Sequence, residues 1–388
     1  MHVLIDASNI IALGARALVL SLLPALMRAM SGWQVSLLLP DTHDFRDLPI
    51  TDRTKIIYWK IARGKLNDLL RLKRLYWDLP RLANKFNPDM VLTLGDLGAL
   101  RLHCPHVIFL HNACFIYSRS EVGNHAWSLV KYSYMIRHLA WSLRSASRVI
   151  VQTPVMAERL AQRYPISSER IVQVAQPVPQ HVLLGLDNRT RFAPIENCAK
   201  PVRLLFLAAY YPHKNHAILP SVAEELRRRG LASRVQVFVT LDENQKASNS
   251  IRNMIQQYPD VITNLGRLPS DQVAGAFRSS SALFLPTLLE SYGLIYLEAM
   301  ACGAPILTSD RDFAHWMCRD LALYFDPFNA ASIVDAIELL PRLTTRDFAQ
   351  RAEKHLQAFP KDWDEVARAF CNVLRGIWVP QNGTLHAR

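Results

Sequence analysis

Short apolar runs alternate along the whole chain with longer segments of helical periodicity. This alternation is typical of parallel sheets whose strands are joined by crossover helices. In the first half, strands are predicted at residues 3–5, 35–39, 56–59, 90–94, 106–110, 149–152 and 171–174. In the second half, they are predicted at 202–207, 235–239, 261–263, 282–285, 305–307 and 322–325. The pattern therefore predicts two open α/β sheets.

The two predicted sheets are separated by a proline-containing stretch without clear periodicity, residues 176–200. Proline lacks an amide proton and disfavours the helical conformation of the residue before it, so this stretch is expected to be a linker. The last periodic segment, residues 363–378, is predicted to be a helix. It either completes the second domain or packs back on the first.

One long apolar stretch, residues 10–27, raises the question of a membrane span. It contains Arg16 near its middle and Pro24 near its end, and a cation at mid-bilayer costs about 3 kcal/mol. A buried first helix is therefore favoured. The N-terminus begins directly with strand-like residues and has no basic region or cleavage site typical of a signal peptide.

The composition indicates a globular, basic protein of 388 residues, with 45 Lys and Arg against 33 Asp and Glu and a formal net charge of +12. Such a chain favours anionic ligands, which include phosphorylated molecules, acidic lipid and nucleic acid. Its six cysteines are scattered and form no CxxC pair, so we expect reduced thiols in the cytoplasm and no zinc site.

The basic residues concentrate in residues 55–85, which hold nine Lys or Arg and two Asp, interleaved with Tyr58, Trp59, Tyr76 and Trp77. Cations beside interfacial aromatic residues could bind an anionic lipid surface. The same residues could equally form a solvated helix face with the aromatic rings turned into the core. The sequence leaves both interpretations open.

Residues 285–305 carry the most specific chemistry. They are predicted to form a strand end, a loop with Glu290 and Gly293, a short helix carrying Glu298, and a turn at Gly303 into the next strand. Ligands of open α/β sheets bind at the carboxyl ends of the strands. Free amides at a helix start suit a diphosphate, and two carboxylates suit a ligand rich in hydroxyl groups.

This segment resembles the motif of the family 4 retaining glycosyltransferases, in which two glutamates are separated by seven residues and the second begins an E-A-M-A-x-G-x-P pattern. The resemblance implies a GT-B fold, two Rossmann-like domains facing each other across a cleft. Residues 1–180, joined by the helix 364–380, would bind the acceptor. Residues 195–363 would bind the nucleotide sugar.

The resemblance also implies residue roles. Glu290 would bind hydroxyls of the transferred sugar and Glu298 those of the ribose, and Lys214 would neutralise the leaving diphosphate. His111 matches the histidine near the reacting sugar, although a lone histidine is more often structural. The remaining expected donor contacts come from the loops and from the helix start: Asn215, Gly266, Arg267, Ser291, Tyr292, Gly293 and Leu294.

Two departures from the family pattern stand out. Ala208 and Ala209 replace a Gly-Arg pair whose arginine contacts phosphate, so Lys214 would act with another group such as Arg267. Asp310 and Asp312 form a D-x-D pattern, but they lie where this family needs no metal. We therefore expect no metal and no cofactor. A GDP-sugar donor is preferred over a UDP-sugar, from the likeness of the loop 210–215 to O-antigen and mannose-transferring members.

The sequence thus predicts transfer of a hexose-type sugar, with retention, to a hydroxyl of a saccharide acceptor. The expected acceptor is lipid-linked, of the lipopolysaccharide or O-antigen type, at the inner face of the cytoplasmic membrane. One alternative is a nucleotide-sugar epimerase of the same fold. Another is a basic nucleic-acid-binding protein, which no P-loop, helix-turn-helix or RNP-like pattern supports.

Overall fold

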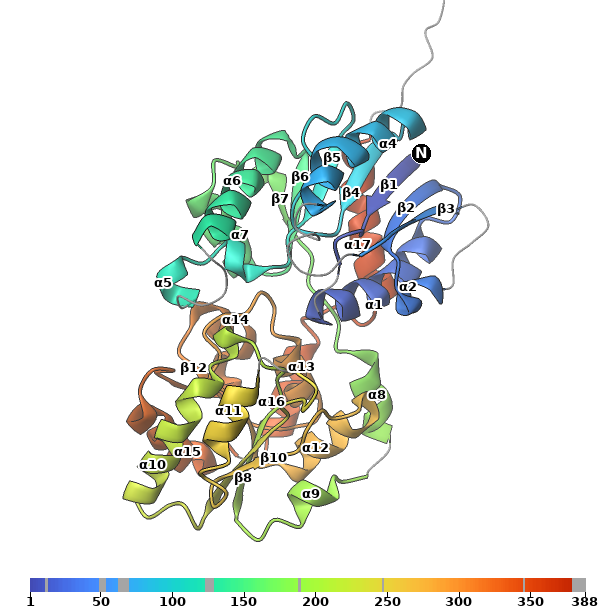
Figure 1. Ribbon diagram of the computed structural model, residues 1–388. Coiled ribbons are helices and arrows are strands. Elements are labelled where there is room, and N and C mark those ends of the chain that lie inside the picture. The colour runs from blue at the N-terminus through green and yellow to red at the C-terminus, as the bar shows by residue number, and fades with distance from the viewer. Residues whose placement is uncertain are drawn as a thin grey trace, which may run out of the picture. The chain divides into compact units, whose positions relative to one another are not determined.

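The computed structural model describes residues 1–10, 13–48, 54–61, 70–122, 129–187, 190–245, 248–344 and 346–378. These residues divide into two compact units. The first contains the described residues of 1–116, 129–176 and from 362 onward, and the second contains those of 117–122 and 177–361. Each unit is built on one parallel sheet with helices on both faces (Figure 1).

The first sheet has seven parallel strands in the order β3-β2-β1-β4-β5-β6-β7. Its strands are β1 His2–Asp6, β2 Gln34–Pro40, β3 Thr54–Trp59, β4 Met90–Thr93, β5 His106–Phe109, β6 Arg148–Val151 and β7 Ile171–Gln173. The central strands β1, β4 and β5 are almost entirely buried. Strands buried on both faces are near-continuous apolar runs, as the sequence pattern indicated.

The second sheet has six parallel strands in the order β10-β9-β8-β11-β12-β13. Its strands are β8 Val202–Phe206, β9 Val235–Val239, β10 Ile262–Asn264, β11 Ala282–Leu285, β12 Ile306–Ser309 and β13 Ala322–Phe325. This order reverses direction between β8 and β11, as in Rossmann-like sheets. All thirteen predicted strands are confirmed, within two residues at each end.

The helices connect the strands in turn. In the first unit they are α1 Leu13–Ala29, α2 His43–Arg46, α4 Leu79–Phe86, α6 Leu129–Ser145, α7 Pro154–Arg163 and α17 Trp363–Arg375. The second unit contains α5 Arg119–Val122, α8 Gln180–Asp187, α9 Ala193–Glu196, α10 Leu219–Arg228, α11 Asn249–Ile255, α12 Val273–Ser279, α13 Leu294–Ala301, α14 Asp312–Cys318, α15 Ala330–Leu343 and α16 Phe348–Leu356.

The apolar stretch near the N-terminus forms α1, a buried helix that includes Pro24. Its side chains pack in one core with β1, β2 and α17. From α17, Phe370 meets Phe109 of β5 edge to face, with ring centroids 5.1 Å apart. Among the helices of the described ranges, none combines the length and hydropathy needed to cross a bilayer.

The expectation of an irregular linker over residues 176–200 is wrong, because two helices lie within it. Helix α8 follows Pro179 directly, and α9 carries Pro194 in its first turn. Proline is tolerated at the first helical position, where its missing amide proton costs nothing. Pro179 and Pro194 therefore mark helix starts.

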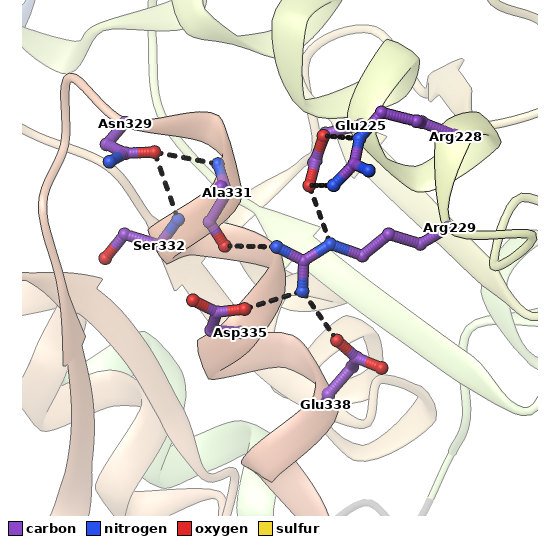
Figure 2. A network of polar contacts seen from close by, with 8 residues as sticks. All are labelled: Glu225, Arg228, Arg229, Asn329, Ala331, Ser332, Asp335 and Glu338. Atoms are coloured by element: carbon purple, nitrogen blue, oxygen red, sulfur yellow. Dashed lines mark hydrogen bonds and ion pairs between the residues drawn. The ribbon is translucent and has the colours of Figure 1, made fainter.

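Arg229, just after α10, ties this helix to α15 (Figure 2). Its guanidinium donates to Glu225 within the same turn, to Asp335 and Glu338 of α15 at 2.6 and 2.7 Å, and to the carbonyl of Ala331. These hydrogen bonds fix two helices that pack beside the sheet of the second unit.

Candidate functional site

The candidate site lies in the second unit, at the carboxyl ends of β8 and β11. These two strands pair directly, and the strand order reverses between them. Loops that leave neighbouring strands at such a reversal diverge and leave room for a ligand. The loop after β8 carries Lys214, and the loop after β11 carries Glu290.

The carbonyl oxygen of His213 holds the two loops together. It accepts a hydrogen bond from the backbone N–H of Leu288 at 2.7 Å and one from the hydroxyl of Thr287 at 3.2 Å. The side chain of Thr287 is fully buried. The sequence analysis did not single out Thr287, since a lone threonine in a loop carries no recognisable signal.

Lys214 and Glu290 form an ion pair, with 2.5 Å between Nζ and Oε1. Both side chains are largely buried, at 17% and 11% exposure, so the attraction between them is less screened than that of a surface pair. The sequence assigned each residue a separate part of the donor. The structure brings the two charges together, so a donor bound here would meet a cation and an acid at one point.

Asn215 follows Lys214 and adopts a left-handed conformation, with φ of 62°. Its side-chain amide donates to the carbonyl of Pro327, at 2.8 Å, in the loop after β13. The sequence predicted a donor contact for Asn215. In the structure, the side chain of Asn215 links the Lys214 loop to the loop after β13.

In the first turn of α13, at the same edge, two backbone N–H groups have no partner among the residues that the structure describes. The first amide bonded within the helix is that of Tyr296, which donates to the carbonyl of Gly293, so Leu294 and Ile295 precede the hydrogen-bonded ladder. Gly293 caps the helix with φ of 81°. These amides and the positive end of the helix dipole suit an anionic group.

Tyr292 and Ser291 complete this loop. The ring of Tyr292 is buried, and its centroid lies 6.3 Å from that of Trp316 and 6.5 Å from that of Phe359. The Tyr292 side chain therefore packs against the core and fixes the loop, and a donor contact through its backbone N–H remains a prediction. Ser291 is half-buried.

Glu298 lies one turn into α13 and is buried. Burial raises the pKa of its carboxyl group to about 8. The imidazole of His181, on α8, lies 3.6 Å from its Oε1 atom, and burial lowers the pKa of this histidine. At neutral pH the Glu298 carboxyl is therefore mostly protonated and can both donate and accept hydrogen bonds, which suits a diol such as ribose.

The raised pKa of Glu298 predicts a pH-dependent stability. In the unfolded chain this carboxyl ionises near pH 4.5, and in the folded protein near pH 8. The free energy of unfolding should fall as pH rises between these values, by at most about 1.4 kcal/mol per pH unit, and level off above them. Denaturant unfolding at pH 5 and pH 8 measures this change. Between the two pH values, the free energy of unfolding should fall less in Glu298→Gln than in the wild type. Glu353→Gln, at an exposed position of α16, should behave like the wild type.

Gly266 and Arg267 lie after β10. Gly266 has φ of 70°, and its N–H donates to the side-chain oxygen of Asn264. The same oxygen accepts the backbone N–H of Leu241, and the side-chain amide of Asn264 donates to the carbonyl of Leu241. Asn264 thus fixes this turn, a role that the sequence analysis missed. The side chain of Arg267 is exposed.

His111 belongs to the first unit, two residues after β5. Its Nε2–H donates to the carbonyl of Leu94 at 2.9 Å, and its Nδ1 lies 3.7 Å from Asp96. The buried carboxylate of Asp96 also accepts the backbone N–H groups of His111 and Asn112. The Leu94 carbonyl therefore orients the histidine ring, and Asp96, which the sequence analysis overlooked, orients the loop through its backbone N–H groups.

The D-x-D pair has protein partners. The carboxylate of Asp310 lies 2.6 Å from Nε2 of His315, and that of Asp312 accepts from the hydroxyl of Tyr117 at 2.9 Å. Within the described ranges, no cluster of three or more His, Cys, Asp or Glu side chains is arranged to hold a metal ion.

Two family models match nearly the whole chain. The model described as Glycosyltransferase Family 4 matches residues 14–180, and the one described as Glycosyl transferases group 1 matches residues 188–355. The chain belongs to glycosyltransferase family 4. The second match covers the loops of Lys214 and Glu290 and all of α13.

Curated relatives align over part of their length. A D-inositol 3-phosphate glycosyltransferase of Arthrobacter sp. (strain FB24) is 28% identical over 57% of this chain and 54% of the relative. The O-antigen chain mannosyltransferase RfbU of Salmonella typhimurium is 22% identical over 56% of this chain and 57% of the relative. The chain thus spans about half the length of the curated relatives it matches.

Solved structures establish the GT-B fold of this family 4 member. The sucrose-phosphate synthase of Thermosynechococcus elongatus superposes with a TM-score of 0.71 at 16% identity, covering 97% of this chain and 98% of that one. Anabaena HepE in complex with UDP and glucose gives a TM-score of 0.63 at 15% identity, covering 97% and 99%. At these identities the likeness concerns the fold.

Proposed function

We propose that this protein transfers a hexose-type sugar, with retention at the anomeric carbon, from a nucleoside-diphosphate sugar to a hydroxyl of a saccharide acceptor. The observation that carries the proposal is the pairing of Lys214 with Glu290 beside the free amides of α13. A sugar nucleotide needs both a cationic, amide-lined place for its diphosphate and acceptor groups for its hydroxyls.

In this proposal the diphosphate lies against the amides of Leu294 and Ile295, and Lys214 stabilises the charge that develops as the nucleoside diphosphate leaves. Glu290 accepts hydrogen bonds from the hydroxyls of the sugar, and Glu298 binds those of the ribose. Arg267, exposed after β10, is a candidate second cation for the position where Ala209 replaces the family's arginine.

The acceptor side of the proposal rests on the first unit. His111 is held by Leu94 and Asp96 at a strand end, which suits a group placed near the reacting sugar. We propose a lipid-linked or lipopolysaccharide-type saccharide acceptor at the inner face of the cytoplasmic membrane, which the basic charge of the chain and its likeness to an O-antigen chain mannosyltransferase favour.

Thermal unfolding with a panel of nucleotide sugars tests the donor site. A ligand that binds only the folded protein stabilises it by about 2.7 kcal/mol at a hundred times its dissociation constant. We expect one donor to raise the melting temperature, with GDP-sugars before UDP-sugars, and Glu290→Ala to abolish the shift. If no sugar nucleotide stabilises the protein, the proposal is wrong. Interconversion of a free sugar nucleotide without an acceptor would instead identify an epimerase.

A further inference from the structure

Two neighbouring helices of the first unit each expose a row of cations with one tryptophan. The first helix continues from the π-helical turn η1 (Arg74–Asp78) into α4. Its exposed side chains include Lys73, Trp77, Arg81 and Lys85, each four residues after the last. Residues at this spacing lie along one side of a helix.

Helix α6 repeats the arrangement. Its exposed side chains include Arg137, Trp141 and Arg144, again three or four residues apart. Trp77 and Trp141 are 56% and 51% exposed, whereas an indole ring is normally mostly buried. Both rows therefore combine positive charge with apolar surface in contact with water.

The two helices contact each other, which places the two exposed rows on adjoining helices. The hydroxyl of Tyr76, in η1, donates to Nδ1 of His138 in α6 at 2.9 Å, and the ring of Trp77 lies beside that of Tyr76. Because Nε2 of His138 donates to the carbonyl of Gly98, its Nδ1 is free to accept. Trp141 follows His138 by three residues on the same helix.

The opposite sides of both helices are buried. Leu79 and Ala83 of α4 pack against β1 and β4, and Leu139 of α6 is fully buried. The exposed rows therefore belong to one surface, which we call the basic-aromatic face: Lys73, Trp77, Arg81, Lys85, Arg137, Trp141 and Arg144.

The charge of this face indicates its partner. Its seven residues include five cations, and one of these, Lys73, lies 3.7 Å from the mostly buried carboxylate of Asp78. Each cation near an anionic bilayer adds about 1 kcal/mol of attraction, and tryptophan prefers the headgroup level of a membrane. The phosphates of a nucleic-acid duplex could also pair with the cations. A duplex has no apolar layer, however, into which the two indole rings could insert.

We propose that the basic-aromatic face binds an anionic bilayer surface, with Trp77 and Trp141 inserted among the lipid headgroups. This proposal names the surface that would bring the first unit to a lipid-linked substrate. It rests on the proposed function for the identity of the acceptor. The binding itself can be measured without any transfer reaction.

Sedimentation of the full chain with lipid vesicles tests the proposal. We expect binding to phosphatidylcholine vesicles that contain about 30 mol % phosphatidylglycerol and little binding to phosphatidylcholine alone. The double variant Trp77→Ala, Arg137→Glu should bind at least about tenfold more weakly. The control, Trp378→Ala with Arg368→Glu, also loses one exposed tryptophan and two units of charge, elsewhere in the same unit, and should stay within about twofold of the wild type.

Three results would overturn the membrane proposal: equal loss of binding in both double variants, equal binding to neutral and anionic vesicles, or no vesicle binding at all. A DNA duplex bound by the wild type and lost only in the Trp77, Arg137 variant, with no vesicle binding, would assign the face to nucleic acid. The rise in melting temperature caused by the sugar nucleotide is measured in the same variants and should be unchanged. A failure of the membrane proposal can therefore be distinguished from a failure of the proposed donor site.

Discussion

Lys214→Met is expected to lower kcat by about 100-fold while the protein stays folded. Removing one preorganised group that stabilises the charge of a transition state typically has an effect of this size. In the free protein, the substitution also leaves the carboxylate of Glu290 without its partner at 2.5 Å. An uncompensated, largely buried charge is destabilising, by up to about 3 kcal/mol. Transfer to a saccharide acceptor and thermal unfolding should therefore be measured together.

A second variant separates these two effects. Lys214→Met combined with Glu290→Gln removes both charges, so it should recover much of the lost stability without recovering activity. Glu290→Gln alone should lower transfer at least about tenfold. Lys354→Met, on the exposed surface of α16, serves as the control and should leave kcat unchanged. Near-normal turnover in both Lys214→Met and Glu290→Gln would refute the assignment of the donor site.

Gly293→Ala is expected to destabilise the protein by about 3 kcal/mol and to abolish donor binding. The residue has φ of 81°, a conformation that costs a residue with a Cβ atom about 1 kcal/mol or more. An added Cβ would also lie 2.5 Å from the ring of Tyr296. That ring cannot move aside, since it is fully buried and its hydroxyl is hydrogen-bonded to Thr308. Denaturant unfolding and donor-induced stabilisation would measure both effects.

Gly230→Ala provides a matched control. Gly230 has a similar φ of 70°, but an added Cβ would meet no atom within 4 Å, and the residue lies just after α10, away from the loops of Lys214 and Glu290. Its substitution should cost only the backbone strain, about 1 kcal/mol, and leave donor binding intact. Equal losses of stability in the two alanine variants would show that the Tyr296 ring does not constrain Gly293.

The strands and the course of residues 285–305 could be predicted because their signals are local. Strands buried on both faces are runs of apolar residues, and Gly293 and Gly303 both have positive φ where the chain enters and leaves α13. The linker prediction failed because proline at a helix start and proline in an irregular segment look alike in a sequence. Only the packing of α8 and α9 distinguishes them.

The contacts inside the site could not be predicted, because they depend on which strands become neighbours. Lys214 and Glu290 are 76 residues apart, and they meet because β8 pairs with β11. Thr287 acts on a backbone carbonyl of the other loop, and Asp96 acts on backbone amides after the next strand. Such partners have no side-chain pattern of their own, so only the folded geometry shows them.

The packing of α17 with α1 has a consequence for biosynthesis. The chain leaves the first unit near residue 176 and returns to it near residue 362. While the ribosome makes everything between, the nascent N-terminal sheet lacks Phe370 and Leu374, which cover part of its apolar face. That face is therefore exposed to chaperones or to other nascent chains until α17 itself has been synthesised.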